Sequence, residues 1–141
     1  MQQHIVLAVD GSRASRKAAR WAVDQARATG ADLEAVHAWS APDMGTDRVD
    51  VALAEPADLD REARRELREV LADLDERGLV APIAARVVES ETVAALLDAC
   101  RTADLVVVGR HGLSGRPEDD PAAVSPRLIQ EACCPVVVVP E

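Results

Sequence analysis

The sequence "ADLVVVGRHGLSGRPEDDPAAVS", residues 103 to 125, contains a short aliphatic run, a glycine-containing loop and the beginning of a helical pattern. The run at 104–109 is aliphatic and bounded by breakers, which is typical of a buried strand. A helical pattern begins near Ala122, with Val124, Leu128 and Ile129 at helical spacing. The stretch therefore predicts one strand–loop–helix unit, and similar units recur along the rest of the chain.

Four other aliphatic runs are also predicted to be strands. They lie at 4–10, 32–39, 82–89 and 135–140. The helical patterns between them begin near Ser12, Pro56 and Thr92, and the first two end at Gly30 and Gly78, while the third ends near Thr102. Strands that alternate with helices predict right-handed crossovers and a parallel sheet that is covered on both faces. We therefore predict a doubly wound, Rossmann-like α/β fold.

The length and composition of the chain indicate how many domains it has and which kinds of partner it can bind. The 141 residues fit one domain over 1–141, and the core must be aliphatic because the chain has no Phe or Tyr and only two Trp. A formal net charge of -9 argues against binding to nucleic acid or to an anionic membrane. No apolar run approaches the roughly 18 residues of a spanning helix, and the first residues do not resemble a signal peptide. We expect a cytoplasmic protein.

The three cysteines, Cys100, Cys133 and Cys134, have no metal-ligand spacing. We expect free thiols, as is usual in a reducing compartment. The adjacent Cys133 and Cys134 could form a redox pair. Packing beside the last strand is the preferred interpretation.

In a doubly wound sheet, ligands bind beyond the carboxyl ends of the strands. Asp10, residues 36–39 and Gly109 are predicted to lie there. The G-x-G-x-x-G fingerprint of dinucleotide-binding proteins and the G-x-x-x-x-G-K-[ST] loop of NTPases are both absent. Asp10 has two open interpretations: it caps the following helix, or its carboxylate accepts hydrogen bonds from a ligand.

The loop after residues 104–109 has two features that suit a phosphate group. Gly109 and Gly112 form G-x-x-G, for which we predict positive φ angles that expose backbone N–H groups. After nine further residues, Ala122 to Ser125 begin a helix whose free N–H groups and dipole favour an anion. The spacing of these two features predicts a phosphate cradle.

Three segments resemble the universal stress protein family: "HIVLAVDGSRASRKAARWAVDQA" (4–26), "ADLVVVGRHGLSG" (103–115) and "CCPVVVVP" (133–140). The resemblance covers essentially the whole chain. It implies the strand order 3-2-1-4-5 and a homodimer formed through the last strand, Val136 to Val139. In the nucleotide-binding branch of the family it also implies one ATP, or a related AMP or ADP, per subunit.

The resemblance also implies which residues would hold the nucleotide. Asp10, with Ala8 and Val9, would lie by the ribose and adenine, and the Val36 backbone would contact the adenine edge. The full implied set is Ala8, Val9, Asp10, Val36, Val108, Gly109, Arg110, Gly112, Ala122, Ala123, Val124 and Ser125.

The family motif is G-x-x-G, nine residues, then G-[ST], and this chain departs from it. Ala122 replaces the glycine and Ala123 replaces the hydroxyl residue. A lost hydrogen bond to a charged group costs roughly 1.5 to 3 kcal/mol, or one to two decades in affinity. The acidic tract at 118–120 is either a solvated loop or a group that helps to hold Mg²⁺.

These observations favour a stress-response protein that binds an adenine nucleotide with weakened affinity and acts through an unknown protein partner. Catalysis is not expected, because no nucleophile is paired with a base and His4, His37 and His111 have no visible triad partners. The alternative is a homodimeric interaction module that does not bind nucleotide. Weak nucleotide hydrolysis, or binding of another anion, is a third hypothesis.

Overall fold

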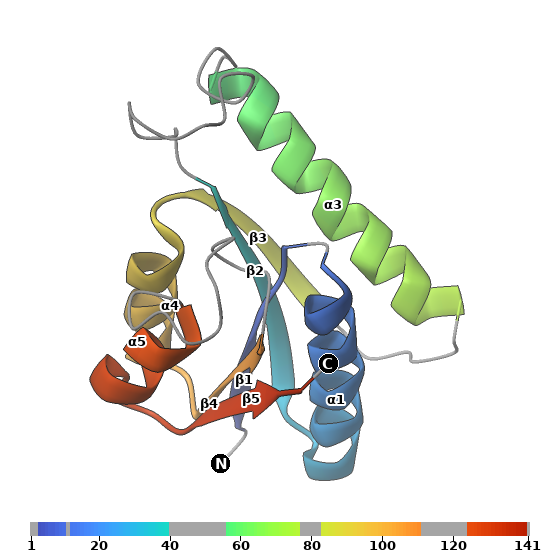
Figure 1. The fold of residues 1–141 in the computed structure, drawn as a ribbon. Coiled ribbons are helices and arrows are strands. Elements are labelled where there is room, and N and C mark those ends of the chain that lie inside the picture. Colours follow the sequence, from blue (N-terminus) through green and yellow to red (C-terminus); the bar gives the residue numbers. More distant parts are fainter. Residues whose placement is uncertain (1–2, 11, 40–55, 77–82, 111–123, 141) are drawn as a thin grey trace.

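The fold was analysed in a computed structural model, which describes residues 3–10, 12–39, 56–76, 83–110 and 124–140 (Figure 1). In chain order the elements are β1 (His4–Ala8), α1 (Arg13–Thr29), β2 (Asp32–Trp39), α3 (Pro56–Glu76), β3 (Ile83–Glu89), α4 (Thr92–Cys100), β4 (Leu105–Gly109), α5 (Val124–Glu131) and β5 (Val136–Val139).

The strands form one parallel sheet in the order β3-β2-β1-β4-β5. Helices α1 and α3 cover one face of this sheet, and α4 and α5 cover the other (Figure 1). The chain winds outward in both directions from β1, as right-handed crossovers require in a doubly wound sheet. The predicted fold class and strand order are therefore confirmed.

An aliphatic core fills the space on each side of the sheet. Helix α1 presents mainly small residues to the sheet, including the fully buried Ala18, Ala19 and Ala22, so its backbone lies close to the strands. Helix α3 presents larger residues, such as Leu67 and Leu74. Each fully buried leucine contributes roughly 1.5 to 3 kcal/mol relative to an exposed one.

The ends of the first helix are where the sequence predicts them. Ser12 is the N-cap, and its Oγ accepts a hydrogen bond from the Ser15 N–H over 3.1 Å. Gly30 ends the helix with a left-handed φ of 71°, a conformation that glycine adopts without strain.

Two other predicted boundaries need correction. Strand β1 ends at Ala8, so Val9 and Asp10 follow the strand. Helix α4 ends at Cys100, and the N–H groups of Arg101 and Thr102 turn back to Asp98 and Ala99 in a tighter final turn. The predicted end of the second helix at Gly78 and the predicted helix start at Ala122 lie outside the described residues.

No helix within the described ranges is both long and apolar enough to span a membrane.

Candidate functional site

The carboxyl ends of β1 and β2 form the floor of the candidate site. The strands pair in register with Ala8 opposite Val36, and the Val9 N–H continues this pairing by donating to the Val36 carbonyl over 2.9 Å. A cavity of about 70 Å³ lies at this point. It is lined by Ala8, Val9, Asp10, Val36, His37, Ala38, Thr92 and Leu96.

The structure therefore brings together four of the residues that the sequence analysis assigned to a nucleotide site. The cavity is smaller than the roughly 300 to 1,000 Å³ of typical small-molecule pockets. These residues can thus form only one part of a nucleotide site.

The structure shows a role for Asp10 in the turn that leads into α1, while its role as a ligand acceptor remains a prediction. Its Oδ1 accepts a hydrogen bond from the Ser12 N–H over 2.8 Å, which fixes the turn into α1. Its own N–H donates to Ser15 Oγ over 3.1 Å. The second carboxylate oxygen, Oδ2, is buried and has no hydrogen-bond partner among the described residues. A buried carboxylate oxygen without a donor is costly, so Oδ2 suits a ligand that donates a hydrogen bond.

Gly109 ends β4 at a point of close backbone contact. A Cβ at this position would lie 2.7 Å from the Ala14 carbonyl carbon and 2.8 Å from its oxygen. Gly109 does not have a positive φ, and of the described glycines only Gly30 does. The predicted positive φ is therefore wrong for Gly109: the residue is glycine because β4 approaches the first turn of α1 too closely for a side chain.

Ser125 connects this strand end to the next helix. Its side chain is buried in the first turn of α5, and its Oγ donates to the Gly109 carbonyl over 3.4 Å. The end of β4 and the start of α5 are therefore adjacent, as a phosphate cradle would require. Val124 is the first residue of α5 and is buried.

Two further predicted site residues lie at the end of β4. Val108 is fully buried in the core, so only its backbone could contact a ligand. The exposed Arg110 follows the strand, and its N–H donates to the Val139 carbonyl over 3.0 Å.

Three predicted site residues, Gly112, Ala122 and Ala123, lie outside the described residues. The same holds for His111 and the acidic tract at 118–120. In the part of the chain that is described, no group of three or more His, Cys, Asp or Glu side chains could hold a metal ion.

The family model described as the universal stress protein family matches residues 1–140. The chain belongs to this family. A universal stress protein of Mycobacterium tuberculosis is 36% identical over 137 residues, which cover 95% of this chain and 43% of the relative. One of Mycolicibacterium smegmatis is also 36% identical over 137 residues, covering 96% of this chain and 45% of the relative. The chain thus spans less than half the length of these curated relatives.

Solved universal stress proteins have the same fold. One, in complex with cAMP, has a TM-score of 0.74 and 26% identity, covering 97% of this chain and 96% of that chain. Another, from Burkholderia pseudomallei, has a TM-score of 0.70 and 28% identity, covering 99% of this chain and 96% of that chain.

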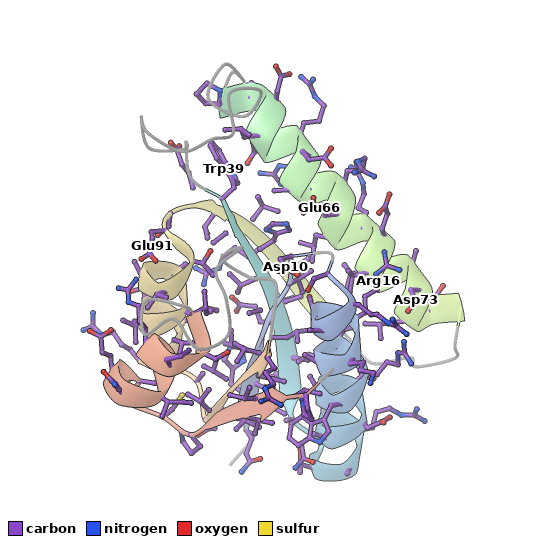
Figure 2. The ribbon with its side chains drawn as sticks, viewed as in Figure 1. Asp10, Arg16, Trp39, Glu66, Asp73 and Glu91 are labelled. Carbon is purple, nitrogen blue, oxygen red and sulfur yellow. The ribbon has the colours of Figure 1, made fainter. Side chains whose placement is uncertain are left out.

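This universal stress protein also has a polar contact between β2 and α3 that the sequence analysis did not find. His37 is buried, and its Nε2 lies 2.6 Å from Glu66 Oε2. Figure 2 labels Glu66 on α3 and Trp39 at the end of β2. Trp39 lies two residues further along β2 than His37, and its Nε1 donates to Asp60 Oδ1 over 3.0 Å. Period-two alternation predicts that His37 and Trp39 share a face of β2, but nothing in the sequence indicates which residues of α3 they meet.

The histidines in the described residues have glutamate partners. His37 pairs with Glu66, and His4 Nε2 lies 3.5 Å from Glu34 Oε2. The sequence analysis did not predict these glutamate contacts; it expected only that the two histidines would have no triad partners. A carboxylate–imidazole pair without a nucleophile does not form a catalytic triad.

Proposed function

We propose that this protein binds an adenine nucleotide, ATP or its AMP or ADP relatives, as a regulatory ligand at the carboxyl ends of β1, β2 and β4. The observation that carries the proposal is the buried Asp10 Oδ2, which has no donor in the described part of the chain and lies beside an apolar floor of Ala8, Val9 and Val36. A solved universal stress protein of the same fold, 26% identical, is described as a complex with cAMP, which supports this class of ligand.

In the proposed complex Asp10 accepts a hydrogen bond from a ribose hydroxyl or from the adenine amino group. Ala8 and Val9 contact the ribose and base, and the Val36 backbone contacts the adenine edge. The phosphates lie toward Gly109 and the first turn of α5, where N–H groups without intrahelical partners and the helix dipole favour an anion. Val108, Arg110, Gly112 and residues 122–125 complete the proposed set.

We expect the affinity to be weakened. Ala123 provides no hydroxyl donor to phosphate, which costs roughly one to two decades in affinity. In this proposal the bound nucleotide regulates the interaction of the protein with a protein partner. We propose no efficient catalytic step. For the acidic tract at 118–120 the two alternatives are a solvated loop and a group that helps to hold Mg²⁺, and the binding experiment below compares them by adding Mg²⁺.

The second candidate function is a homodimeric interaction module that does not bind nucleotide. The small volume of the cavity, about 70 Å³, and the two alanines at 122 and 123 favour this alternative. Both candidates share the proposed dimer through β5, so nucleotide binding discriminates between them.

Calorimetry with ATP or AMP, with and without Mg²⁺, tests the proposal. We expect binding by the wild type and a 10- to 100-fold loss in Asp10→Asn, because asparagine retains the acceptor for Ser12 but replaces one carboxylate oxygen with a donor. Asp24→Asn, at an exposed position of α1, is the matched control and should bind like the wild type.

The double change Ala122→Gly with Ala123→Ser should tighten binding if the site is only weakened. Absence of heat at millimolar nucleotide in both the wild type and this double variant would reject nucleotide binding and leave the interaction module. Equal binding by Asp10→Asn and the wild type would place the ligand elsewhere.

A further inference from the structure

Two cysteines far apart in the sequence meet where α4 ends and β5 begins. Cys100 is the last residue of α4 and is buried, whereas Cys133 is exposed in the turn between α5 and β5. Their Sγ atoms lie 3.0 Å apart. A disulfide bond needs about 2.0 Å, so the sulfur atoms must approach by only about 1 Å.

Two hydrogen bonds hold the Cys100 sulfur in this arrangement. Cys100 Sγ donates to the Leu97 carbonyl over 3.0 Å, and the Cys133 N–H donates to Cys100 Sγ over 3.4 Å. The turn that carries Cys133 is also anchored at both ends. The Ala132 N–H donates to Leu128 in α5 over 2.9 Å, and the Pro135 carbonyl accepts from Val106 in β4 over 3.0 Å.

We propose that Cys100 and Cys133 are a redox modification site, at which a small-molecule disulfide of the glutathione type converts the two thiols into an intramolecular disulfide. This site is separate from the proposed nucleotide site, and the proposal does not depend on nucleotide binding. The observation that supports thiol–disulfide exchange is the contact of the two sulfur atoms at 3.0 Å.

The exchange has two balanced steps. The thiolate of the exposed Cys133 attacks one sulfur of the small disulfide, whose S–S bond breaks and releases one small thiolate, which takes up a proton. The Cys100 sulfur then loses its proton and attacks the Cys133 sulfur of the mixed disulfide, which releases the second small thiol. Two protein thiols are oxidised, and one small disulfide is reduced to two thiols.

The exposure of the two cysteines indicates which of them reacts first with the small disulfide. Cys133 is exposed and can meet a small molecule, whereas Cys100 is 3% exposed and can react only with a neighbour already in place. Because the two sulfur atoms are held in contact, the second step has the advantage of an intramolecular reaction. The mixed disulfide at Cys133 should therefore be short-lived.

Cys134 is the third thiol of this region and would compete with Cys100 for a disulfide bond to Cys133. Burial, followed by the nearby Cys100 and Cys133, raises the pKa of its thiol to about 11, and Asp104 acts in the same direction. A thiol with so high a pKa has little thiolate at neutral pH and reacts slowly. A disulfide between the adjacent Cys133 and Cys134 would also require a strained local geometry.

The rate of exchange should depend on pH. The hydrogen bond to Cys100 raises the pKa of Cys133, with burial adding to the effect, whereas Arg101 lowers it. A raised pKa reduces the thiolate fraction at neutral pH, so exchange is slow there and accelerates as pH rises.

The disulfide would connect the end of α4 to the turn that leads into β5. It would close a long loop, since the two cysteines are 33 positions apart, and loop closure restricts the unfolded chain. We expect the midpoint of thermal unfolding to rise by roughly 5 to 15 °C on oxidation. Amide hydrogen exchange in β5 should slow at the same time.

The test incubates the reduced, full-length protein with oxidised glutathione at pH 8 and maps the cysteines by mass spectrometry without reduction. We expect a product that has lost two hydrogens, with Cys100 linked to Cys133 and reversal by dithiothreitol. The same treatment of Cys134→Ser should give the same link. Cys100→Ser, in contrast, should retain glutathione on Cys133, because the sulfur that displaces it is gone.

Three results would overturn the proposal: stable glutathione on Cys133 in the wild type, a link between Cys133 and Cys134, or no reaction in the native protein although the denatured protein reacts. If Cys100→Ser fails to fold, Cys133→Ser provides the second variant. It removes an exposed thiol and should abolish both the link and the rise in thermal stability.

Discussion

At the scale of single residues, Gly109 and Asp10 have roles that depend on contacts between different elements. Gly109 permits the end of β4 to approach the backbone of Ala14 in α1. Asp10 uses one carboxylate oxygen to fix the start of α1 and leaves the other, buried oxygen without a donor among the described residues. The close approach and the buried Oδ2 occur at the same edge of the sheet, where we propose that the nucleotide binds.

Gly109→Ala should lower the free energy of unfolding by about 1 to 3 kcal/mol, because the added methyl group overpacks a tight contact. Urea unfolding followed by tryptophan fluorescence measures the loss. Two of the three nearest atoms belong to the Ala14 backbone, so adding Ala14→Gly should recover only part of the stability. A Gly109→Ala protein as stable as the wild type would show that β4 and α1 can separate at little cost.

At the scale of elements, α3 is attached to the end of β2 through polar side chains as well as through its apolar face. His37 pairs with Glu66, and Trp39 donates to Asp60, which also accepts from Arg64 Nε over 2.7 Å. The hydrogen bond from Arg64, followed by that from Trp39, lowers the pKa of Asp60 from its ordinary value of 3.8. The ionised form of Asp60 therefore favours the folded state.

This lowered pKa predicts how stability depends on pH. The contribution of Asp60 should be fully present above pH 3.8, the ordinary value, and should be lost as pH falls through the lower pKa of the folded state. The stability difference between the wild type and Asp60→Asn should therefore shrink on acidification. Urea unfolding of both proteins across this range measures it, and Asp58→Asn, which is more exposed and has no bond to Trp39, is the control. A difference that stays constant with pH would contradict the assignment.

At the scale of the whole molecule, β5 is an edge strand of four valines. The carbonyls of Pro135 and Val139 accept hydrogen bonds from the β4 side, so the backbone groups of Val136 and Val138 face away from the sheet. An apolar edge of this kind, which no described strand covers, is suited to pairing with a second copy of the strand. The homodimer through Val136 to Val139 remains our proposal.

Val138→Pro tests this dimer. Proline removes the Val138 N–H, which faces the free edge, while the hydrogen bonds to β4 stay in place. We expect the wild type to have twice the 15.0 kDa chain mass in light scattering at micromolar concentration, and Val138→Pro to have the chain mass alone. Val138→Ala retains the N–H and should remain dimeric. A monomeric wild type, or a dimeric Val138→Pro with native stability, would exclude pairing through β5.

The sequence predicts the fold well because the signals for its elements are local. Aliphatic runs bounded by breakers, the Ser12 cap and the Gly30 stop all depend on residues close together in the chain. Contacts between elements carry no such signal. The positive φ expected of Gly109 is wrong because its packing against Ala14 depends on how β4 and α1 are placed, and the glutamate partners of His4 and His37 were missed for the same reason.

The alternation of strands and helices and the aliphatic core follow from the sequence alone. Family resemblance adds the strand order and the prediction of a nucleotide site. Three features come from the packing of the elements: Asp10 keeps one buried oxygen without a described donor, Gly109 is required by close packing, and Cys133 contacts Cys100 across 33 positions. The physical reason is that local propensity and hydrophobic period depend on neighbours in the chain. Contacts and burial at a site depend on how the packed elements bring distant residues together.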